Sequence, residues 1–307
     1  DEYPGYAAGN LLNLLRCLAW PLDGVDCSGL TIREACLYDV TLQTASFRQT
    51  HFAGARFAQT FGAVSALAYS PTNAWIAIGA ADGQVALWQP HEDALACVWQ
   101  GHDSWILSAS ASVDGALLAT ASEDQTVRLW AVEGLARPPH CLHTLRGHTG
   151  RIRAVAFQPR TESTTGPPIL ASAGDDGAII LWDGAAGRPL QRLQSETGAI
   201  RSLAFLPGGD LLVSGGNDRL ITLWDLRLGH PRSRWAGHAH DISKVICHPS
   251  GEMIASGGRD ETVRIWQLPS GRCIKTLHAH AGPISTMTFS PDGRWLATAS
   301  DDQTVNM

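Results

Sequence analysis

The stretch Gly101-His102-Asp103-Ser104-Trp105 is followed by a short apolar run, then by Leu117-Leu118-Ala119-Thr120-Ala121-Ser122-Glu123-Asp124, and then by Thr126-Val127-Arg128-Leu129-Trp130. The same order of residues returns from Gly147, Gly237 and Ala279, and in altered form from Ser195. A unit that recurs at a fixed interval indicates a repeat architecture in which each unit is one supersecondary element. From about residue 62 onward, the chain consists of copies of this unit.

The repeat has a period of 42 residues. An Asp marks each copy, at Asp82, Asp124, Asp176, Asp218, Asp260 and Asp302. A Trp follows six residues later in five copies, at Trp88, Trp130, Trp182, Trp224 and Trp266. One interval, from Asp124 to Asp176, is longer by ten residues. The extra residues fall in the polar, turn-rich segment 160–168, which we expect to lengthen one surface loop.

Each copy has the pattern of four short strands. Residues 200–205 alternate in polarity, Pro207-Gly208-Gly209 predicts a turn, and 211–215 form a second strand. A tight turn at Asn217-Asp218-Arg219 leads to a third strand that ends at Trp224, and weaker fourth strands are expected at 97–99 and 274–277. Four short strands every 42 residues are typical of the blades of a β-propeller.

The N-terminal part follows other periods. Residues 8–19 carry a leucine stripe at helical spacing (Leu11, Leu12, Leu14, Leu15 and Leu18), which predicts a short capping helix. Large apolar residues then recur every five positions, at Leu22, Cys27, Ile32, Leu37, Leu42, Phe47, Phe52 and Phe57. Small or β-branched residues precede some of them by two positions, at Ala35, Val40, Ala45 and Ala55. Period five suits neither a helix nor a strand, but it suits a square coil of about two turns. The segment resembles a right-handed pentapeptide-repeat β-helix; the alternative is an irregular linker with accidental spacing.

The composition argues against several classes of protein. The chain of 307 residues has a net charge of −6, whereas nucleic-acid-binding proteins usually present a basic face. No apolar run approaches the ~18 residues that a membrane helix needs. The seven cysteines are scattered without a Cys-x-x-Cys pair, so we expect them to be small buried residues of a protein in a reducing, cytoplasmic location.

The long repeat resembles the WD-repeat family, whose literal Trp-Asp occurs here at Trp224-Asp225. The resemblance implies a structural tetrad of His, Ser or Thr, Asp and Trp in each blade. Its members are His102, Thr120, Asp124, Trp130, His148, Ser172, Asp176, Trp182, Ser214, Asp218, Trp224, His238, Ser256, Asp260, Trp266, His280, Thr298 and Asp302. A buried imidazole needs hydrogen-bond partners, and a fully satisfied polar network stiffens a core.

The pattern is incomplete in three copies. The first has Ile78 where the hydroxyl belongs, the fourth has Glu196 in place of His, and the sixth stops before its Trp. The predicted fold is therefore an all-β WD-repeat propeller of five full blades and a truncated sixth, behind a short helix and a pentapeptide coil. Because the family most often has seven blades, we expect the chain to be a fragment of a longer array, with Phe57–Phe61 as a candidate outer strand. The predicted domains are 1–19, 20–61 and 62–307.

No catalytic or metal-binding pattern is present. The sequence lacks a phosphate loop, His-Glu-x-x-His and Gly-x-Ser-x-Gly. His238-Ala239-His240 and His278-Ala279-His280 could place two imidazoles on one side, but one His of each pair belongs to the tetrad. The strict repetition of the Asp residues argues for structure, since an active site is normally built once. We therefore expect no enzyme activity, no metal and no cofactor within these residues.

The family resemblance implies a partner-binding surface on the narrow face of the propeller. The matching residues are Trp105, Leu107, Arg151, Arg153, Arg201, Asp241 and Arg259, with Glu123 and Asp175 beside them. Trp and Arg are enriched in binding hot spots. The alternative is structural: Trp105 packs on its own blade, and the arginines pair with Glu123 and Asp175 across blades.

The order of leucine-rich helix, coil and WD repeats resembles the C-terminal sensor region of bacterial STAND-type (NACHT or NB-ARC) signalling NTPases. This resemblance implies a non-catalytic scaffold or sensor that binds proteins or peptides and regulates an attached NTPase, with no role for nucleic acid or membrane. The alternatives are a free-standing WD-repeat adaptor and the WD-repeat region of a Ser/Thr protein kinase.

Overall fold

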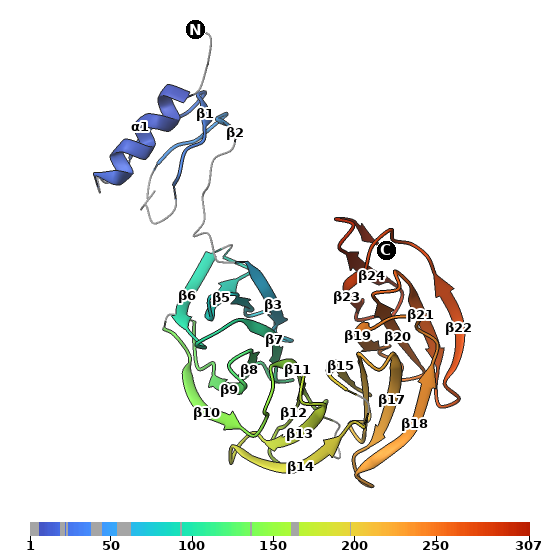
Figure 1. Cartoon of the computed structure of the whole chain (residues 1–307). Helices are drawn as coiled ribbons and strands as arrows, with labels where there is room; N and C mark the ends of the chain where they lie inside the picture. The colour runs from blue at the N-terminus through green and yellow to red at the C-terminus, as the bar shows by residue number, and fades with distance from the viewer. Residues whose placement is uncertain are drawn as a thin grey trace. The chain divides into compact units, whose positions relative to one another are not determined.

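The computed structural model describes residues 6–18, 22, 24–37, 45–53, 63–92, 94–135, 137–160, 166–196 and 198–307. The chain divides into two compact units, 1–61 and 62–307. The smaller unit contains one helix and two short strands among its described residues, and the larger unit contains six β-sheets (Figure 1).

The smaller unit is built from a parallel pair of strands whose partners lie 20 residues apart. Strand β1 (Thr31–Arg33) pairs with β2 (His51–Ala53) with Ile32 opposite Phe52. The bridge between Asp26 and Ser46 repeats the same offset. Twenty residues correspond to four five-residue sides, so this is the spacing that a square coil requires.

The five-residue series forms the core of this unit. Leu22, Cys27, Ile32 and Leu37 are buried, and Phe47 and Phe52 pack against them. Leu42, Val40, Ala55, Phe57 and the proposed outer strand Phe57–Phe61 lie outside the described residues. The irregular-linker alternative does not account for a buried residue at every fifth position. Membership in the pentapeptide-repeat class and the handedness of the coil stay predictions.

Helix α1 (Tyr6–Cys17) begins two residues earlier than the predicted helix. It packs against this core, but fewer of its leucines contact the core than the leucine stripe predicted. Leu12 is buried and Leu15 packs at its edge, but Leu11, Leu14 and Leu18 are exposed. The reason lies at Gly9, because a Cβ there would overlap the backbone carbonyl of Arg33. The helix approaches β1 along its Gly9–Leu12 side, and the other leucines turn away.

The larger unit consists of five four-stranded blades and one three-stranded blade, each antiparallel with its strands in sequence order. Blade 1 consists of β3 (Val64–Tyr69), β4 (Ile76–Ala80), β5 (Gln84–Gln89) and β6 (Ala94–Gln100). Blade 2 consists of β7 (Ile106–Ala111), β8 (Leu117–Ser122), β9 (Thr126–Ala131) and β10 (His140–Arg146). Blade 3 consists of β11 (Ile152–Phe157), β12 (Ile169–Gly174), β13 (Ala178–Asp183) and β14 (Arg188–Gln194). Blade 4 consists of β15 (Ile200–Phe205), β16 (Leu211–Gly216), β17 (Leu220–Asp225) and β18 (His230–Ala236). Blade 5 consists of β19 (Ile242–Cys247), β20 (Met253–Gly258), β21 (Val263–Gln267) and β22 (Arg272–Leu277). Blade 6 consists of β23 (Ile284–Phe289), β24 (Leu296–Ser300) and β25 (Val305–Asn306).

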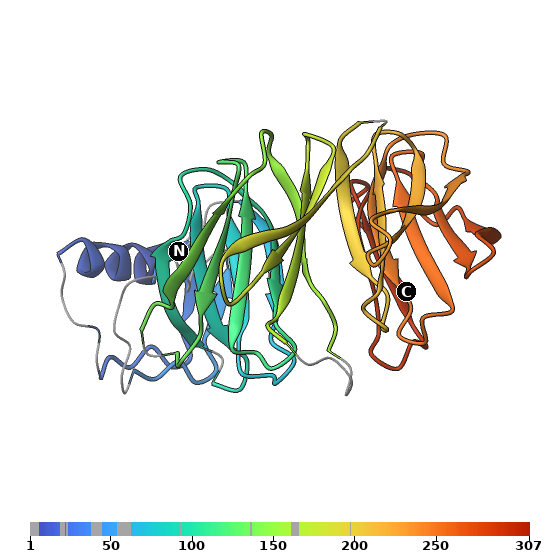
Figure 2. The same ribbon diagram turned by 90° about the horizontal axis from the view of Figure 1, so that it is seen from below.

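The predicted propeller, with five full blades and a shorter sixth, is confirmed. The first strands β3, β7, β11, β15, β19 and β23 lie innermost, and the sheets stand upright side by side (Figures 1 and 2). The segment 160–168 joins β11 to β12, as the longer interval predicted, although 161–165 lie outside the described residues.

The apolar core lies between neighbouring sheets. Each joint packs an Ile that opens one blade against a Gly or Ala in the second strand of the blade before it. A Cβ at Gly79 would come within 2.6 Å of Ile106, and one at Gly257 within 2.6 Å of Ile284. Burial of one such branched side chain contributes about 1.5–3 kcal/mol. The small residue therefore sets how closely two blades approach.

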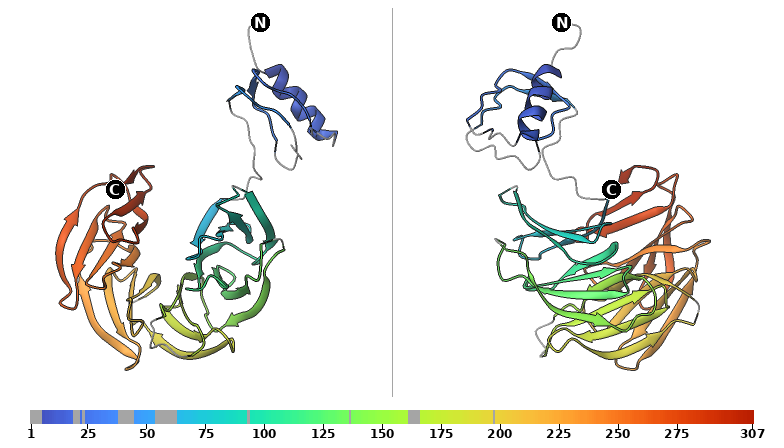
Figure 3. Two further views of the ribbon diagram at one scale, coloured as in Figure 1. Left: turned by 180° about the vertical axis from the view of Figure 1, so that it is seen from behind. Right: turned by 60° about the vertical axis from the view of Figure 1, so that its left-hand side comes forward.

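Each end blade exposes a position that another blade buries against its neighbour. Leu67 of β3 is 63% exposed, although its counterparts Val155, Leu203, Val245 and Met287 are buried at the joint with the preceding sheet. At the other end, Trp295 is 63% exposed, whereas its counterpart Trp75 is buried and donates to the carbonyl of Gly115 on the next blade. Blades 1 and 6 stand at the two ends of the row of sheets (Figure 3).

The cysteines depart from the expectation of uniform burial. All seven are free thiols, and Cys27 is buried, but Cys17 and Cys141 are exposed. Cys141 lies on the outermost strand of its blade, where alternate side chains face solvent. In the described part of the chain, no helix has the length and apolar character that crossing a membrane requires.

Candidate functional site

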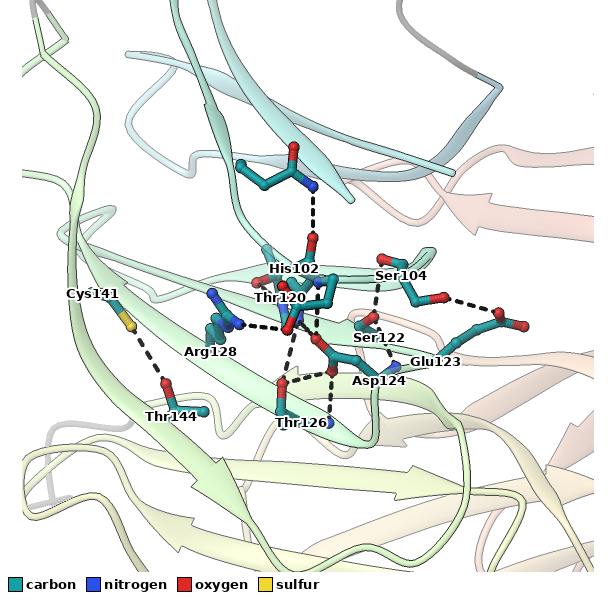
Figure 4. A network of polar contacts seen from close by, with 12 residues as sticks. His102, Ser104, Thr120, Ser122, Glu123, Asp124, Thr126, Arg128, Cys141 and Thr144 are labelled. Carbon is teal, nitrogen blue, oxygen red and sulfur yellow. Dashed lines mark hydrogen bonds and ion pairs between the residues drawn. The ribbon is translucent and has the colours of Figure 1, made fainter. Parts of the chain in front are cut away.

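The second blade contains a continuous chain of polar contacts (Figure 4). His102 is fully buried, and its Nδ1 lies 2.8 Å from the carboxylate of Asp124. Its Nε2 lies 2.8 Å from the Thr120 hydroxyl, which also accepts a hydrogen bond of 2.9 Å from the indole N–H of Trp130. Four residues from the loop, the second strand, the turn and the third strand are thereby joined.

The same contacts recur in the third and fifth blades. His148 bridges Asp176 and Ser172, and Trp182 donates to the same Ser172 hydroxyl at 2.8 Å. The counterparts in the fifth blade are His238, Ser256, Asp260 and Trp266, in which Nε2 and Oγ are 2.6 Å apart. The structure thus brings together the predicted groups in these blades.

The donors in this chain can be assigned by elimination. An indole N–H can only donate, so the Ser172 hydroxyl accepts from Trp182 and directs its own hydrogen to Nε2 of His148. The imidazole is then neutral, with its proton on Nδ1, where it donates to Asp176. Each hydrogen has one acceptor, and the network is satisfied without a positive charge in the core.

The titration behaviour of these groups agrees with a neutral imidazole. Burial lowers the pKa of His148 and of His238, and this effect exceeds the opposing influence of their Asp partners. Burial alone would raise the pKa of Asp176, but the hydrogen bonds from His148 and from backbone N–H groups prevail, so the pKa lies below its ordinary value. The carboxylates of Asp124 and Asp260 also have lowered pKa values for this reason.

The three incomplete blades keep only parts of the network. In the fourth, Trp224 donates to Ser214 at 2.8 Å, and Glu196 pairs instead with Arg234. In the sixth, His280 contacts Thr298 and Asp302. In the first, Asp82 accepts from the backbone N–H of Gln84 beside Ile78.

A further hydroxyl, which the sequence analysis did not single out, completes the turn in three blades. Thr126 donates to Asp124 at 2.6 Å, Thr262 to Asp260 at 2.8 Å and Thr304 to Asp302 at 2.7 Å. The signal was available, because each Thr lies two residues after its Asp. The residue between them, such as Gln125 with φ of 66°, adopts the left-handed conformation that these contacts hold in place.

The residues predicted for the narrow face gather where the loops before the first strands meet the turns between second and third strands. Trp105 is 51% exposed, and its role in binding stays a prediction. Asp241 and Arg259 lie side by side through the hydrogen bond from the Arg259 N–H to the Asp241 carbonyl. Leu107 is set apart from them, because it lines the cavity between the inner strands.

Ion pairs on this face join blade 2 to blade 3 and blade 4 to blade 5. Arg151 contacts Glu123 of the preceding blade at 2.7 Å, as the structural alternative expected. Arg153, however, binds Asp175 of its own blade through two hydrogen bonds of 2.8 and 3.0 Å. The reason is that Asp175 lies beside the start of the first strand of its own blade, where its N–H donates to the carbonyl of Arg151. Arg201 lies 3.6 Å from Asp241 of the next blade and contacts Asn217, which the sequence analysis did not single out.

Arg259 differs from the other arginines of this face. Its side chain is exposed and has no hydrogen bond or ion pair with any described residue. Burial, together with the like charges of Arg153 and Arg259, lowers the pKa of Arg201. Asp241 and Asp175 oppose this effect. Among the described residues, no group of three or more His, Cys, Asp or Glu side chains could hold a metal ion.

Loss of one hydroxyl should cost more in a complete tetrad than in an incomplete one. Ser172→Ala leaves both His148 Nε2 and the Trp182 N–H unpaired, whereas Ser214→Ala leaves only the Trp224 N–H. Because an unpaired buried group costs about 1–3 kcal/mol, we expect Ser172→Ala to lower the free energy of unfolding by that much more than Ser214→Ala. Urea denaturation of both variants measures the difference, and equal costs would contradict the network assignment.

The tetrads should also make stability depend on pH in two stages. The folded pKa of His148 and His238 lies below the ordinary 6.5, so the unfolded chain binds more protons and stability falls as the pH drops through about 6.5. The carboxylates have pKa values below 3.8, so their contribution, present above about pH 4, is lost in stronger acid. Urea midpoints between pH 8 and pH 3 measure both stages. The double variant His148→Gln, His238→Gln should not show the loss of stability near pH 6.5. A wild-type urea midpoint that stays the same from pH 7 to pH 5 would refute the effect assigned to these histidines.

Comparison with known proteins supports the assignment of the repeats. The family model described as WD domain, G-beta repeat matches residues 55–89, 94–131, 139–183, 187–225, 229–267 and 271–307, which together are well over half of the chain. The first match covers β3 to β5, and each later match takes the last strand of one sheet together with the first three strands of the next.

Several relatives share part of the array. The nuclear distribution protein nudF 2 of Penicillium rubens is 34% identical over 122 residues, which cover 36% of this chain and 26% of that protein. An uncharacterised WD repeat-containing protein of Nostoc sp. is 34% identical over 102 residues (33% and 8%). The ribosome biogenesis protein WDR12 homolog of Chlamydomonas reinhardtii is 31% identical over 148 residues (48% and 32%). The matched part is less than a third of each relative, and the six family matches show that this chain belongs to the WD domain, G-beta repeat family.

Proposed function

We propose that the propeller is a non-catalytic scaffold whose narrow face binds a protein or peptide. The observations that carry this proposal are that Trp105 is 51% exposed and that the Arg259 side chain is exposed and has no partner among the described residues. Both residue types contribute strongly to protein interfaces, because each combines a large contact area with a polar group. WD-repeat propellers in general bind other proteins, which agrees with this role.

The charges of the face favour a partner with an acidic side chain. Arg151 and Arg153 are already neutralised by Glu123 and Asp175 at 2.7 and 2.8 Å. Arg259 has no such partner among the described residues, and it contributes to the positive field that lowers the pKa of Arg201. A carboxylate of the partner placed near Arg259 would gain a charge-assisted hydrogen bond without breaking an existing pair.

The finer role as the regulatory arm of a bacterial signalling NTPase rests on the order of helix, coil and WD repeats. The alternatives to this role are a free-standing adaptor and the WD-repeat region of a Ser/Thr protein kinase. In a parent protein that carries an NTPase, deletion of 62–307 should change the basal ATPase rate, because the arm would restrain the enzyme. An unchanged rate would refute this role and leave the scaffold proposal untouched.

The scaffold proposal can be tested with peptides selected from a displayed random library against the wild-type chain. We expect Trp105→Ala and Arg259→Glu each to weaken binding of the selected peptides tenfold or more, which corresponds to about 1.4 kcal/mol. Isothermal titration calorimetry measures the dissociation constants. The selected sequences should be enriched in Asp and Glu.

Two matched substitutions serve as controls. Trp295→Ala removes a Trp that is 63% exposed from the turn between β23 and β24, and Arg232→Glu reverses an exposed charge on the outer strand β18. Neither should weaken binding. Equal losses at the narrow face and at these positions, with circular dichroism unchanged, would place the binding surface elsewhere.

A further inference from the structure

Lys244 stands alone among the residues at its position in the repeat. It is the third residue of the inner strand β19, and its counterparts in the other blades are Ala66, Ser108, Ala154, Ser202 and Thr286. All of these are small. Lys244 lines a cavity together with residues of β3, β7 and β23. These strands and β19 are the innermost strands of their blades (Figure 1).

The space that Lys244 enters is a cavity of about 280 Å³. Residues of β3 and β7 line it from one side, and Lys244 of β19 and Thr286 of β23 line it from the other. A water molecule occupies about 30 Å³ in the liquid, so the cavity can hold several waters or one small polar group. Apart from Lys244, the lining side chains are apolar or carry a hydroxyl.

The ammonium group has no compensating charge. Lys244 makes no hydrogen bond or ion pair with a described residue, and the desolvation that accompanies its burial lowers the pKa of this amine with no charged group acting on it. The side chain keeps some exposure, and that exposure is toward the cavity. Burial therefore disfavours the charged form of this amine, and a bound anion would favour that form.

Two neighbouring hydroxyls can complete a site for an anion. The Ser108 Oγ accepts the backbone N–H of Val155 at 3.2 Å, and its own hydrogen has no acceptor among the described residues. Thr286 is exposed, its hydroxyl has no hydrogen-bond partner among the described residues, and it lines the same cavity. Ser65, in contrast, already donates to the carbonyl of Ile106. One cation and two free donors form a set that recognises oxygen anions.

We propose that this cavity is a binding site for a carboxylate or another small oxyanion, held by Lys244 with Ser108 and Thr286. The anion can arrive as a free small molecule or as an acidic side chain of a bound protein, and both sources present the same chemistry. The site lies between the inner strands, so it is separate from Trp105 and Arg259, and it does not depend on the narrow-face proposal.

The lysine content of the chain allows a direct experiment. Only Lys244 and Lys275 are present, and Lys275 is exposed on β22, so it is a built-in control. The full chain labelled with ¹³C and ¹⁵N at lysine should give two side-chain signals, assigned with Lys275→Arg. Their pKa values are followed by NMR in Tris buffer during titration with sodium acetate, inorganic phosphate and an acetylated Glu-Glu dipeptide amide, with sodium chloride as the control for screening.

We expect Lys244 to titrate below Lys275 without these anions, and its pKa to rise with saturation as an oxyanion is added, while Lys275 responds only as it does to chloride. Saturation by acetate or phosphate would indicate a free anion, and saturation by the dipeptide alone would indicate an acidic side chain of a partner. A Lys244 response that chloride reproduces, or no saturable response to any probe, would overturn the proposal.

A stability measurement provides a second readout. The thermal midpoint of the wild-type chain should rise with the effective oxyanion, because a ligand that binds only the folded state stabilises it. Lys244→Met should abolish this rise, whereas Lys275→Met should keep it. An equal rise in Lys244→Met would show that the anion acts elsewhere.

Discussion

The constraint on which the propeller depends is the apolar joint between neighbouring sheets. At each joint an Ile that opens one blade, such as Ile106 or Ile284, packs against a Gly or Ala in the blade before it. This contact is present where the polar network is incomplete as well as where it is complete. A larger side chain at Gly79 or Gly257 would force the sheets apart, because close-packed interiors tolerate little added volume.

The His-hydroxyl-Trp-Asp network performs a different task. It connects the loop before a blade with the turn and two strands of that blade, so it fixes the position of the loop residues that form the narrow face. The imidazole of His148 stays neutral because Ser172 donates to it and Asp176 accepts from it. The network therefore orders a surface at little electrostatic cost, while the joints supply most of the burial.

The same repetition makes departures informative. At the third residue of the inner strand, five blades carry a small residue and the remaining blade carries Lys244. The shared architecture does not require a lysine there, so Lys244 points to a property that is specific to this chain. Arg259 is a departure of the same kind, since Glu123, Asp175, Asn217 and Asp301 occupy its position in other blades. Both are cations without partners among the described residues, one in the cavity and one on the face, and each is suited to an anionic group.

The sequence by itself determined the class of fold, the six repeats and the location of the long loop, because the repeat recurs every 42 residues with one longer interval. The members of the tetrads were implied by the resemblance of these repeats to the WD-repeat family. The sequence could not determine which arginine pairs within a blade and which pairs across, since this depends on how the loops and turns of neighbouring blades meet in space: Arg153 pairs with Asp175, but Arg151 pairs with Glu123. Nor could it show that Leu11, Leu14 and Leu18 turn away from the core, because close approach at Gly9 sets the rotation of the helix. The isolation of Lys244 was also invisible, because only the tertiary structure brings β3, β7, β19 and β23 around one cavity and shows that no carboxylate lines it.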